Sequence, residues 1–252
     1  MTPLHFLLAL PRILDYSHYS HYGEAESFYL SFLRKHTMHL ISLNIGIPKA
    51  ENFHGHEVVT GLCKLPVHTS LTLTKTGFAG DGVQDKKHHG GEDKAVCAYN
   101  GDHYAHWERV LNEKLPPAAF GENLTVAGLS EEKVHLGDIF RLGTAVLQVS
   151  QPRQPCKTLA ARYGRNDFVK LVVDAGYTGN YFRVLDPGTI APDDVLELVR
   201  HDTHRVTIAF ANRILHHDRK NRTGIETVLS VPALSSSWRK SFQELLENCA
   251  AV

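Results

Sequence analysis

The stretch AVLQVSQPRQPC at residues 145–156 joins a strand-like run to a rigid turn. The apolar run 145–149 predicts a strand that crosses a core. Two prolines then end that strand, because proline fixes its own φ and has no N–H to donate. The turn presents Arg153 and Cys156 three residues apart. A thiolate is a soft ligand for transition metals, and a guanidinium pairs with phosphate or carboxylate. The stretch therefore predicts a site for an anionic, metal-bearing cofactor.

The composition is that of an ordinary globular protein without net charge. The chain has 252 residues, of which 42% are hydrophobic and 21% are charged, as is typical of globular domains. Lys and Arg together number 27, as do Asp and Glu. This balance argues against broad electrostatic binding to nucleic acid or to an anionic membrane. A site for an anion must therefore be local.

The four cysteines, Cys63, Cys97, Cys156 and Cys249, lie far apart in the sequence. They form no C-x-x-C pair, which argues against a structural zinc site and a thioredoxin-like motif. We interpret Cys63 and Cys97 as small buried hydrophobes, because both lie in apolar or strand-like runs. Cys249 lies close to the C-terminus and is interpreted as incidental. The spacing is not that of a secreted disulfide framework, so we expect a cytoplasmic location.

Residues 1–37 differ from the rest of the chain. The apolar run 6–10 is too short to cross a membrane, and the His-, Tyr- and Ser-rich stretch 16–22 has no periodicity. A convincing first strand begins at Met38. We therefore interpret residues 1–37 as an N-terminal extension or a mis-called start. An amphipathic helix over residues 24–35 is the alternative interpretation.

From Met38 to about Arg200 the chain reads as short strands separated by turns, several of which contain glycine. Such spacing favours a barrel or a closed sandwich. Helical periodicity interrupts the strands at residues 101–111 and 165–175. We expect a mainly β fold, a β-barrel with a few peripheral helices, over residues 38–202. The expected strands are 39–46, 57–62, 68–73, 95–99, 124–126, 139–142, 145–149 and 195–199.

After Asp202 the pattern becomes helical. Residues 206–214 and 224–229 each suit a short helix, and Ser235–Ser237 offer N-cap residues for a third helix that contains Trp238. We expect a small three-helix domain over residues 203–252.

Two further segments are candidates for binding an anion. Residues 77–82 hold three glycines, and KKHHGG at 86–91 precedes Asp93 and Lys94. Successive backbone N–H groups in such loops can form a nest for an anion, although most glycine-rich loops are plain turns. The loops fit neither a Walker A motif nor G-x-G-x-x-G, so ordinary nucleotide-binding folds are disfavoured. The segment FGENL at 120–124 places two polar side chains beside a glycine turn, and its plainer interpretation is a hairpin with a satisfied Asn.

These segments together resemble the MOSC domain family, the β-rich module named for the C-terminal domain of molybdenum-cofactor sulfurase. The tail resembles the small three-helix domain that follows MOSC in bacterial YiiM-type proteins. The resemblance covers about residues 40–200, and residues 1–37 have no recognised counterpart in it. The segments that carry it are Gly80-Asp81, His89-Gly90-Gly91 with Asp93-Lys94, Phe120 to Leu124, Gly137-Asp138 and Gln151 to Cys156.

The resemblance implies binding of the molybdenum cofactor (molybdopterin), a pterin with a dithiolene and a phosphate. It implies that Cys156 is the protein ligand to the metal and a catalytic residue, since its thiolate is a soft donor. Asp81 is kept as a second catalytic candidate that handles protons or orients other groups, and a turn-capping Asp is the alternative. The residues implied in cofactor binding are Arg153, His89, Gly90, Gly91, Lys94 and Asn123.

By the same resemblance, the chain is expected to be an oxidoreductase that reduces N-hydroxylated compounds. The substrate would be an N-hydroxylated purine, an amidoxime or a hydroxylamine, and the N–OH group would become N–H with loss of water. The sequence shows no flavin or iron–sulfur motif, so we expect a separate reductase to supply the electrons. The three-helix tail is either a docking surface for that reductase or a cover for the barrel.

Two other interpretations stay open. The first is a non-catalytic carrier of the cofactor, or a sulfur-transfer module that uses a persulfide on Cys156. Against it, the sequence shows no pyridoxal-dependent desulfurase domain, and pyridoxal phosphate is not expected to bind. The second is a structural barrel with an unrelated partner.

Overall fold

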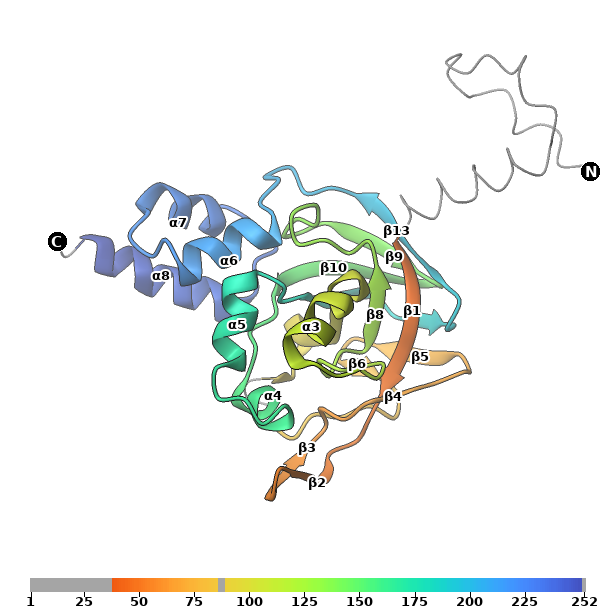
Figure 1. The fold of residues 1–252 in the computed structure, drawn as a ribbon. Coiled ribbons are helices and arrows are strands. Elements are labelled where there is room, and N and C mark those ends of the chain that lie inside the picture. Colours follow the sequence, from red (N-terminus) through yellow and green to blue (C-terminus); the bar gives the residue numbers. More distant parts are fainter. Residues whose placement is uncertain (1–37, 86–88, 251–252) are drawn as a thin grey trace, which may run out of the picture. The chain divides into compact units, whose positions relative to one another are not determined.

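The computed structural model describes residues 38–85 and 89–250 (Figure 1). The interpretations of residues 1–37 as an extension, a mis-called start or a helix over 24–35 lie outside the described residues. Within the described ranges, every helix is too short or too polar to cross a membrane.

Seven strands close into a barrel. In order around it they are β1 (Met38–Ile45), β8 (Leu124–Ala127), β7 (Val96–Asn100), β11 (Asn180–Asp186), β10 (Ala145–Pro152), β9 (Ile139–Leu142) and β13 (Val195–Arg200). Met38 of β1 lies opposite Leu196 of β13, which joins the two ends of the sheet. The pair β7 and β8 is parallel, and the other neighbours are antiparallel. The predicted mainly β barrel is confirmed.

Shorter strands and helices surround the barrel. The additional strands are β2 (Lys49–Phe53), β3 (His56–Thr60), β4 (Leu65–Pro66), β5 (Leu71–Thr74), β6 (Gly77–Phe78) and β12 (Gly188–Ile190). The helical segments are η2 (Glu92–Lys94), η3 (Gly101–His103), α3 (Tyr104–Leu111), α4 (Lys157–Arg162) and α5 (Phe168–Ala175). Strands β2 and β3 form a hairpin, and β5 pairs with both β6 and β12.

Strand β10 continues three residues beyond the predicted end at Val149. Gln151 lies opposite Tyr181 of β11, and Pro152 lies opposite Asn180. The register shifts between Val149 and Gln151, so a bulge takes up the irregularity before the proline. Pro152 is the last residue of the strand, where the missing N–H interrupts no further pairing. The prediction that both prolines lie beyond the strand was therefore wrong for Pro152.

Three C-terminal helices pack on the barrel and share its hydrophobic core. They are α6 (Ile208–His216), α7 (Arg222–Leu229) and α8 (Ser236–Ala250). Ile214, Trp238 and Phe242 are buried in the same apolar cluster as Val149 of β10. The backbone N–H of Trp238 donates to Ser235 Oγ at 3.2 Å, the N-cap geometry that the serine run predicts. The small C-terminal helical region is thus confirmed, and much of its apolar surface is buried against the barrel.

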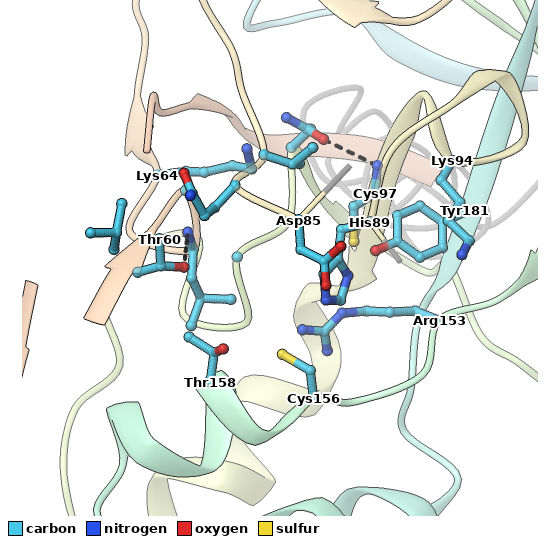
Figure 2. A pocket seen from close by; sticks show the side chains of 17 residues that line it. Thr60, Lys64, Asp85, His89, Lys94, Cys97, Arg153, Cys156, Thr158 and Tyr181 are labelled. Atoms are coloured by element: carbon cyan, nitrogen blue, oxygen red, sulfur yellow. Dashed lines mark hydrogen bonds between the residues drawn. The ribbon is translucent and has the colours of Figure 1, made fainter. Parts of the chain in front are cut away.

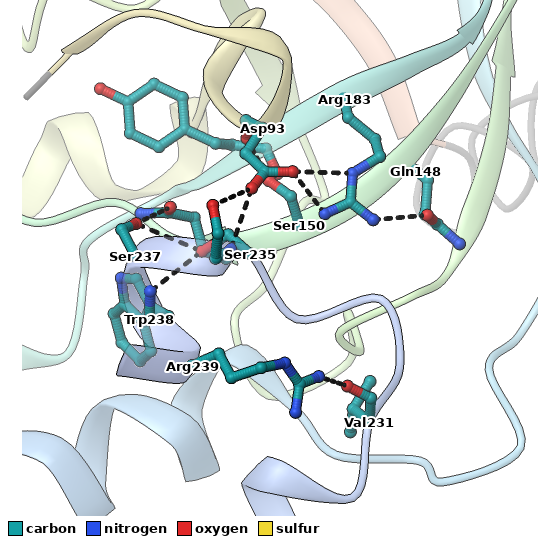
Figure 3. A network of polar contacts seen from close by, with 12 residues as sticks. Asp93, Gln148, Ser150, Arg183, Val231, Ser235, Ser237, Trp238 and Arg239 are labelled. Carbon is teal, nitrogen blue, oxygen red and sulfur yellow. Dashed lines mark hydrogen bonds and ion pairs between the residues drawn. The ribbon is translucent and has the colours of Figure 1, made fainter. Parts of the chain in front are cut away.

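Asp93 joins α8 to the loop that precedes β7 (Figure 3). Its Oδ2 accepts hydrogen bonds from the backbone N–H of Ser236 at 2.9 Å and from Ser236 Oγ at 3.0 Å. Its Oδ1 lies 2.6 Å from Nη2 of Arg183 on β11. One carboxylate therefore contacts the helical region and the barrel at once. Because Asp93 directly precedes Lys94, the start of α8 also fixes the loop that carries Lys94.

The same junction holds the end of β10. Ser150 Oγ donates to the backbone carbonyl of Asp93 at 2.5 Å, and the backbone N–H of Ser235 donates to the carbonyl of Ser150 at 2.9 Å. Ser237 Oγ donates to Gln151 Oε1 at 3.1 Å. Ser235 and Ser237 at the start of α8 therefore bind the strand that leads directly to Arg153.

We predict that Asp93→Asn lowers the free energy of unfolding at neutral pH by about 1–2 kcal/mol, because hydrogen bonds to a charged acceptor are lost. Burial alone would raise the pKa of Asp93, but the Ser236 N–H and the Arg183 guanidinium outweigh it and lower the pKa. The contribution is therefore complete above the unfolded pKa of about 4 and is lost as the pH falls through the lower folded pKa.

Urea unfolding at several pH values measures this difference. Asp193→Asn, at an exposed carboxylate, is the control and should change stability little. Equal stability of Asp93→Asn and the parent at pH 7 would contradict the assigned role of the junction.

Candidate cofactor site

A cavity of about 180 Å³ lies where loops beside β3, β7, β11 and α4 converge (Figure 2). The polar and charged residues that line it are Thr60, Lys64, Gln84, Asp85, His89, Lys94, Cys97, Asn123, Arg153, Cys156, Thr158 and Tyr181. Five of the residues predicted for the site are among them: Arg153, Cys156, His89, Lys94 and Asn123. Segments that are far apart in the sequence thus meet in one place.

Arg153 is the buried cation of this cavity. The residue is 4% exposed, and its Nη2 donates to the carbonyl oxygen of Phe120 at 2.6 Å. Its Nη1 is buried and has no hydrogen-bond partner among the described residues. Leaving a buried charged donor unsatisfied is costly. Arg153 is therefore suited to an anionic ligand that would supply the missing acceptor.

Cys156 lies at the N-cap of α4, three residues after Arg153. Burial alone would raise the pKa of its thiol. The hydrogen bond from His89, the charge of Arg153 and the backbone N–H of Leu159 outweigh burial and lower the pKa to about 6. Figure 2 shows the side chains of Cys156, His89 and Arg153 gathered on one side of the cavity. At neutral pH the sulfur is therefore a thiolate, the form that binds metals and acts as a nucleophile.

The loop before β7 contributes both His89 and Lys94 to the cavity. Lys94 is half-buried, and burial lowers its pKa, although Asp93 and Asp85 oppose that shift. Gly90 and Gly91 follow His89 but are not among the described residues that line the cavity. Gly91 has a φ of 94°, and a Cβ added there would meet no atom within 4 Å. Glycine is therefore favoured at position 91 because of the positive φ, and not because a side chain would collide with a neighbour.

Asn123 and Asp81 form a network behind the cavity wall. Asn123 Nδ2 donates to Asp81 Oδ2 at 2.8 Å and to the carbonyl of Asn44 at 3.2 Å, so both of its N–H groups are engaged within the protein. Asp81 also accepts the backbone N–H of Gly46 at 2.8 Å and forms an ion pair with the buried Lys64. Asp81 is not among the described lining residues. These contacts make Asp81 a group that orients Lys64 and Asn123, which do line the cavity.

Cys97, Tyr181 and Lys64 line the cavity although the sequence did not single them out as site residues. Burial raises the pKa of Cys97 to about 11, and burial likewise raises the pKa of Tyr181. The two side chains are hydrogen-bonded to each other. Both keep their protons at neutral pH, in contrast to Cys156. Cys97 is indeed a buried residue, as predicted, but it also lines the cavity. The aromatic and β-branched residues of 180–186 were the available signal for the strand that carries Tyr181.

The arrangement combines a thiolate with cationic and neutral donors in a half-enclosed space. The thiolate of Cys156 offers one soft donor atom to a metal. Arg153 and Lys94 provide positive charge next to it, and Arg153 holds an unsatisfied N–H. These groups fit a cofactor that carries both a metal and an anionic group.

Comparisons with known proteins agree on one family. A family model described as MOSC domain matches residues 85–197, and one described as YiiM-like, 3-alpha helix domain matches residues 206–248. YflK of Bacillus subtilis is 50% identical over 205 residues, which cover 81% of this chain and 93% of that protein. YiiM of Escherichia coli is 38% identical over 188 residues, which cover 73% of this chain and 84% of that protein.

Solved structures give the same result. The crystal structure of YiiM from Geobacillus stearothermophilus has a TM-score of 0.71 and 40% identity, and the match covers 83% of this chain and 99% of that chain. A Gibberella moniliformis protein named Reductase is 33% identical over 166 residues, which cover 64% of this chain but 29% of that protein.

We predict that alkylation of Cys156 by iodoacetamide follows an apparent pKa of about 6, because the thiolate is the reactive form. Arg153→Gln should move the profile to higher pH by removing the neighbouring positive charge. Mass spectrometry of the native protein, alkylated over a pH series, gives both profiles. Cys97 in the same molecule is the internal control and should stay unmodified below about pH 9, since its thiol is buried with a pKa of about 11. A Cys156 profile centred near pH 9 would refute the assigned electrostatics.

Proposed function

This chain belongs to the MOSC family, in the group with a YiiM-like three-helix domain, and we propose that it is a molybdenum-cofactor-dependent reductase of N-hydroxylated compounds. The observation that carries the proposal is the pairing, in one cavity, of a low-pKa thiol with a buried guanidinium whose Nη1 has no acceptor among the described residues. The Gibberella moniliformis relative named Reductase adds support for the reaction class.

The residues present fit the cofactor by the chemistry of their donor atoms. Cys156 would hold the metal through its sulfur, because molybdenum in a dithiolene environment accepts soft thiolate donors. Arg153 Nη1 would donate to an anionic group of the cofactor, and Lys94 and His89 lie on the neighbouring loop. Gly91, with a φ of 94°, allows that loop its backbone conformation, and Gly90 precedes it. Asn123 would support the wall beside the cofactor rather than donate to it, since its N–H groups are engaged.

The bound cofactor would supply a two-electron reduction. An N–OH group takes up two electrons and two protons, and the products are N–H and water. The substrate class is an N-hydroxylated purine, amidoxime or hydroxylamine, as the family resemblance implies.

The chain's own residues would control charge and protons around that reaction. His89 donates a hydrogen bond to Cys156 Sγ, so it holds a proton on a ring nitrogen beside the sulfur. Cys97 and Tyr181 retain their protons because burial raises both pKa values, and they serve as neutral wall groups. Asp81 would act at a distance by orienting Lys64 and Asn123. His89 and the exposed Asp85 are the groups that we assign to proton delivery from solvent.

A separate reductase would supply the electrons, because the sequence shows no flavin or iron–sulfur motif. The fungal relative is much longer than this chain, which covers 29% of it. We propose that the electron donor of this chain is a second protein, which docks near the cavity when the cofactor is bound.

A carrier or sulfur-transfer module is the second candidate function. The same low pKa of Cys156, about 6, would favour formation of a persulfide on its sulfur. That function requires exchange of the cofactor or of sulfur and no reduction of N–OH compounds. The two functions differ in a measurable way.

We expect about one molybdenum per chain when the protein is purified from a host that makes the cofactor. Cys156→Ser should retain at least about tenfold less metal, because a hydroxyl is a poorer ligand for a soft site than a thiolate. Elemental analysis and pterin fluorescence measure the two components. Cys249→Ser, which changes a cysteine outside the cavity, is the matched control and should match the parent.

The same preparations are then assayed with N-hydroxyadenine and a reduced viologen dye as the electron source. The parent and Cys249→Ser should form adenine, and Cys156→Ser should not. Molybdenum without turnover would favour the carrier function. Equal and negligible molybdenum in all three proteins, even after reconstitution with free cofactor, would refute both the metal-ligand role of Cys156 and the reductase proposal.

A further inference from the structure

A second group of metal-ligating side chains lies outside the cofactor cavity, at the junction of the barrel and α6. His135 and Asp138 lie just before β9, and His201 directly follows β13. One donor atom of each residue lies within 4.8 Å of the donor atoms of the other two. His135 also forms an isolated bridge with Thr207, the N-cap residue of α6. The group thus lies where three structural segments meet.

The distances from the carboxylate to the two imidazole nitrogens are close to those between ligand atoms of one metal ion. Asp138 Oδ2 lies 3.1 Å from His135 Nδ1 and 3.1 Å from His201 Nδ1. Two ligand atoms of a tetrahedral ion with bonds of 2.0–2.1 Å lie about 3.3 Å apart. The two imidazole rings are perpendicular, with centroids 5.1 Å apart. Both rings therefore direct the same nitrogen toward the same oxygen without stacking on each other.

Both imidazoles and two backbone N–H groups gather on the Asp138 carboxylate. Besides the two imidazole nitrogens, Asp138 Oδ2 accepts the backbone N–H of His135 at 3.0 Å. Three nitrogens thus converge on one oxygen of the carboxylate. His201 Nδ1 is in addition shared between Oδ2 and Oδ1, the latter at 3.2 Å. A single cation between the three residues would use one lone pair from each of them and leave the backbone hydrogen bond intact.

The carboxylate is also held in place in advance. The Asp138 side chain is 1% exposed, and its Oδ1 accepts the backbone N–H of Asp202 at 2.9 Å. Backbone donors that orient a ligating carboxylate are typical of built metal sites. The preceding loop is tightly packed, since a Cβ added to Gly137 would lie 2.5 Å from Asp202 Oδ2. The His201 side chain, by contrast, is 40% exposed, which leaves a path to solvent for a further ligand.

We propose that His135, Asp138 and His201 form a binding site for a divalent transition-metal ion of the zinc class. Two imidazole nitrogens and one carboxylate oxygen suit Zn²⁺ and neighbouring ions, with water in the remaining position. The site is distinct from the cofactor cavity, since none of its three residues lines that cavity. A bound metal ion would link the end of β13 to the start of β9. It would stabilise the folded state, because the ion binds the folded chain and not the unfolded one.

The test titrates the chelator-treated, full-length chain with Co²⁺ and Zn²⁺, with Cys156→Ser in every protein compared, because the Cys156 thiolate itself binds soft metal ions. We expect one saturable equivalent, and visible Co²⁺ bands without the sulfur-to-metal charge transfer that a cysteine ligand would give. His201→Ala should weaken binding by more than the 10–100-fold that loss of an outer ligand partner costs. His204→Ala is the matched control, because His204 binds Asp202 instead of Asp138 and should leave the affinity unchanged.

Thermal unfolding gives a second readout. Zn²⁺ should raise the Tm of the parent and of His204→Ala but not that of His201→Ala, and His135→Gln should repeat the loss through a different ligand. Histidines elsewhere in the chain are common to all four proteins, so weak binding to them cancels. The proposal is overturned if the parent shows no saturable equivalent, if both ligand variants bind Co²⁺ as the parent does, or if the bands show sulfur ligation.

Discussion

The burial of one guanidinium, that of Arg153, determines the electrostatics of the candidate site. A charged group removed from water is destabilised by several kcal/mol unless hydrogen bonds and opposite charge compensate. Arg153 donates one such bond, from Nη2 to the carbonyl oxygen of Phe120. Phe120 is in turn held by the ring of Tyr99, which stacks on it with centroids 4.0 Å apart. Trp107 Nε1 donates a hydrogen bond of 2.6 Å to Tyr99 Oη. The aromatic cluster therefore holds the carbonyl that accepts from Arg153, and the thiolate of Cys156 provides the opposite charge.

Most of the barrel could be predicted from the sequence, because alternation and glycine turns report local conformation. Strand β9 was predicted with its observed bounds, and the serine run gave the start of α8. Strand β11 was missed, because 180–186 has no apolar–polar alternation, and Tyr181 was missed with it. The contact between β11 and β10 joins residues more than 25 positions apart. Such pairings depend on the folded sheet rather than on neighbouring residues.

The candidate site was predicted in part for a similar reason. The family resemblance implied one site for Arg153, Cys156, His89 and Lys94, and all four line one cavity. It did not reveal how each polar atom is used. Asn123 was expected to donate to a cofactor, yet its amide hydrogens bind Asp81 and Asn44. A residue pattern indicates which side chains are near each other, whereas the occupied lone pairs and N–H groups follow from the complete three-dimensional network.

The carboxylate of Asp93 has a consequence for how such chains can be recombined. Its two oxygens face different parts of the molecule, with Arg183 on one side and Ser236 on the other. A barrel separated from its C-terminal helices would leave one oxygen without its donors and expose the apolar surface beneath Trp238. A graft of foreign helices would have to bring a matching hydroxyl and backbone amide to the same point. The helical region therefore cannot be exchanged freely between proteins. Only a helical region from a chain that forms the same contacts with Asp93 would fit this barrel.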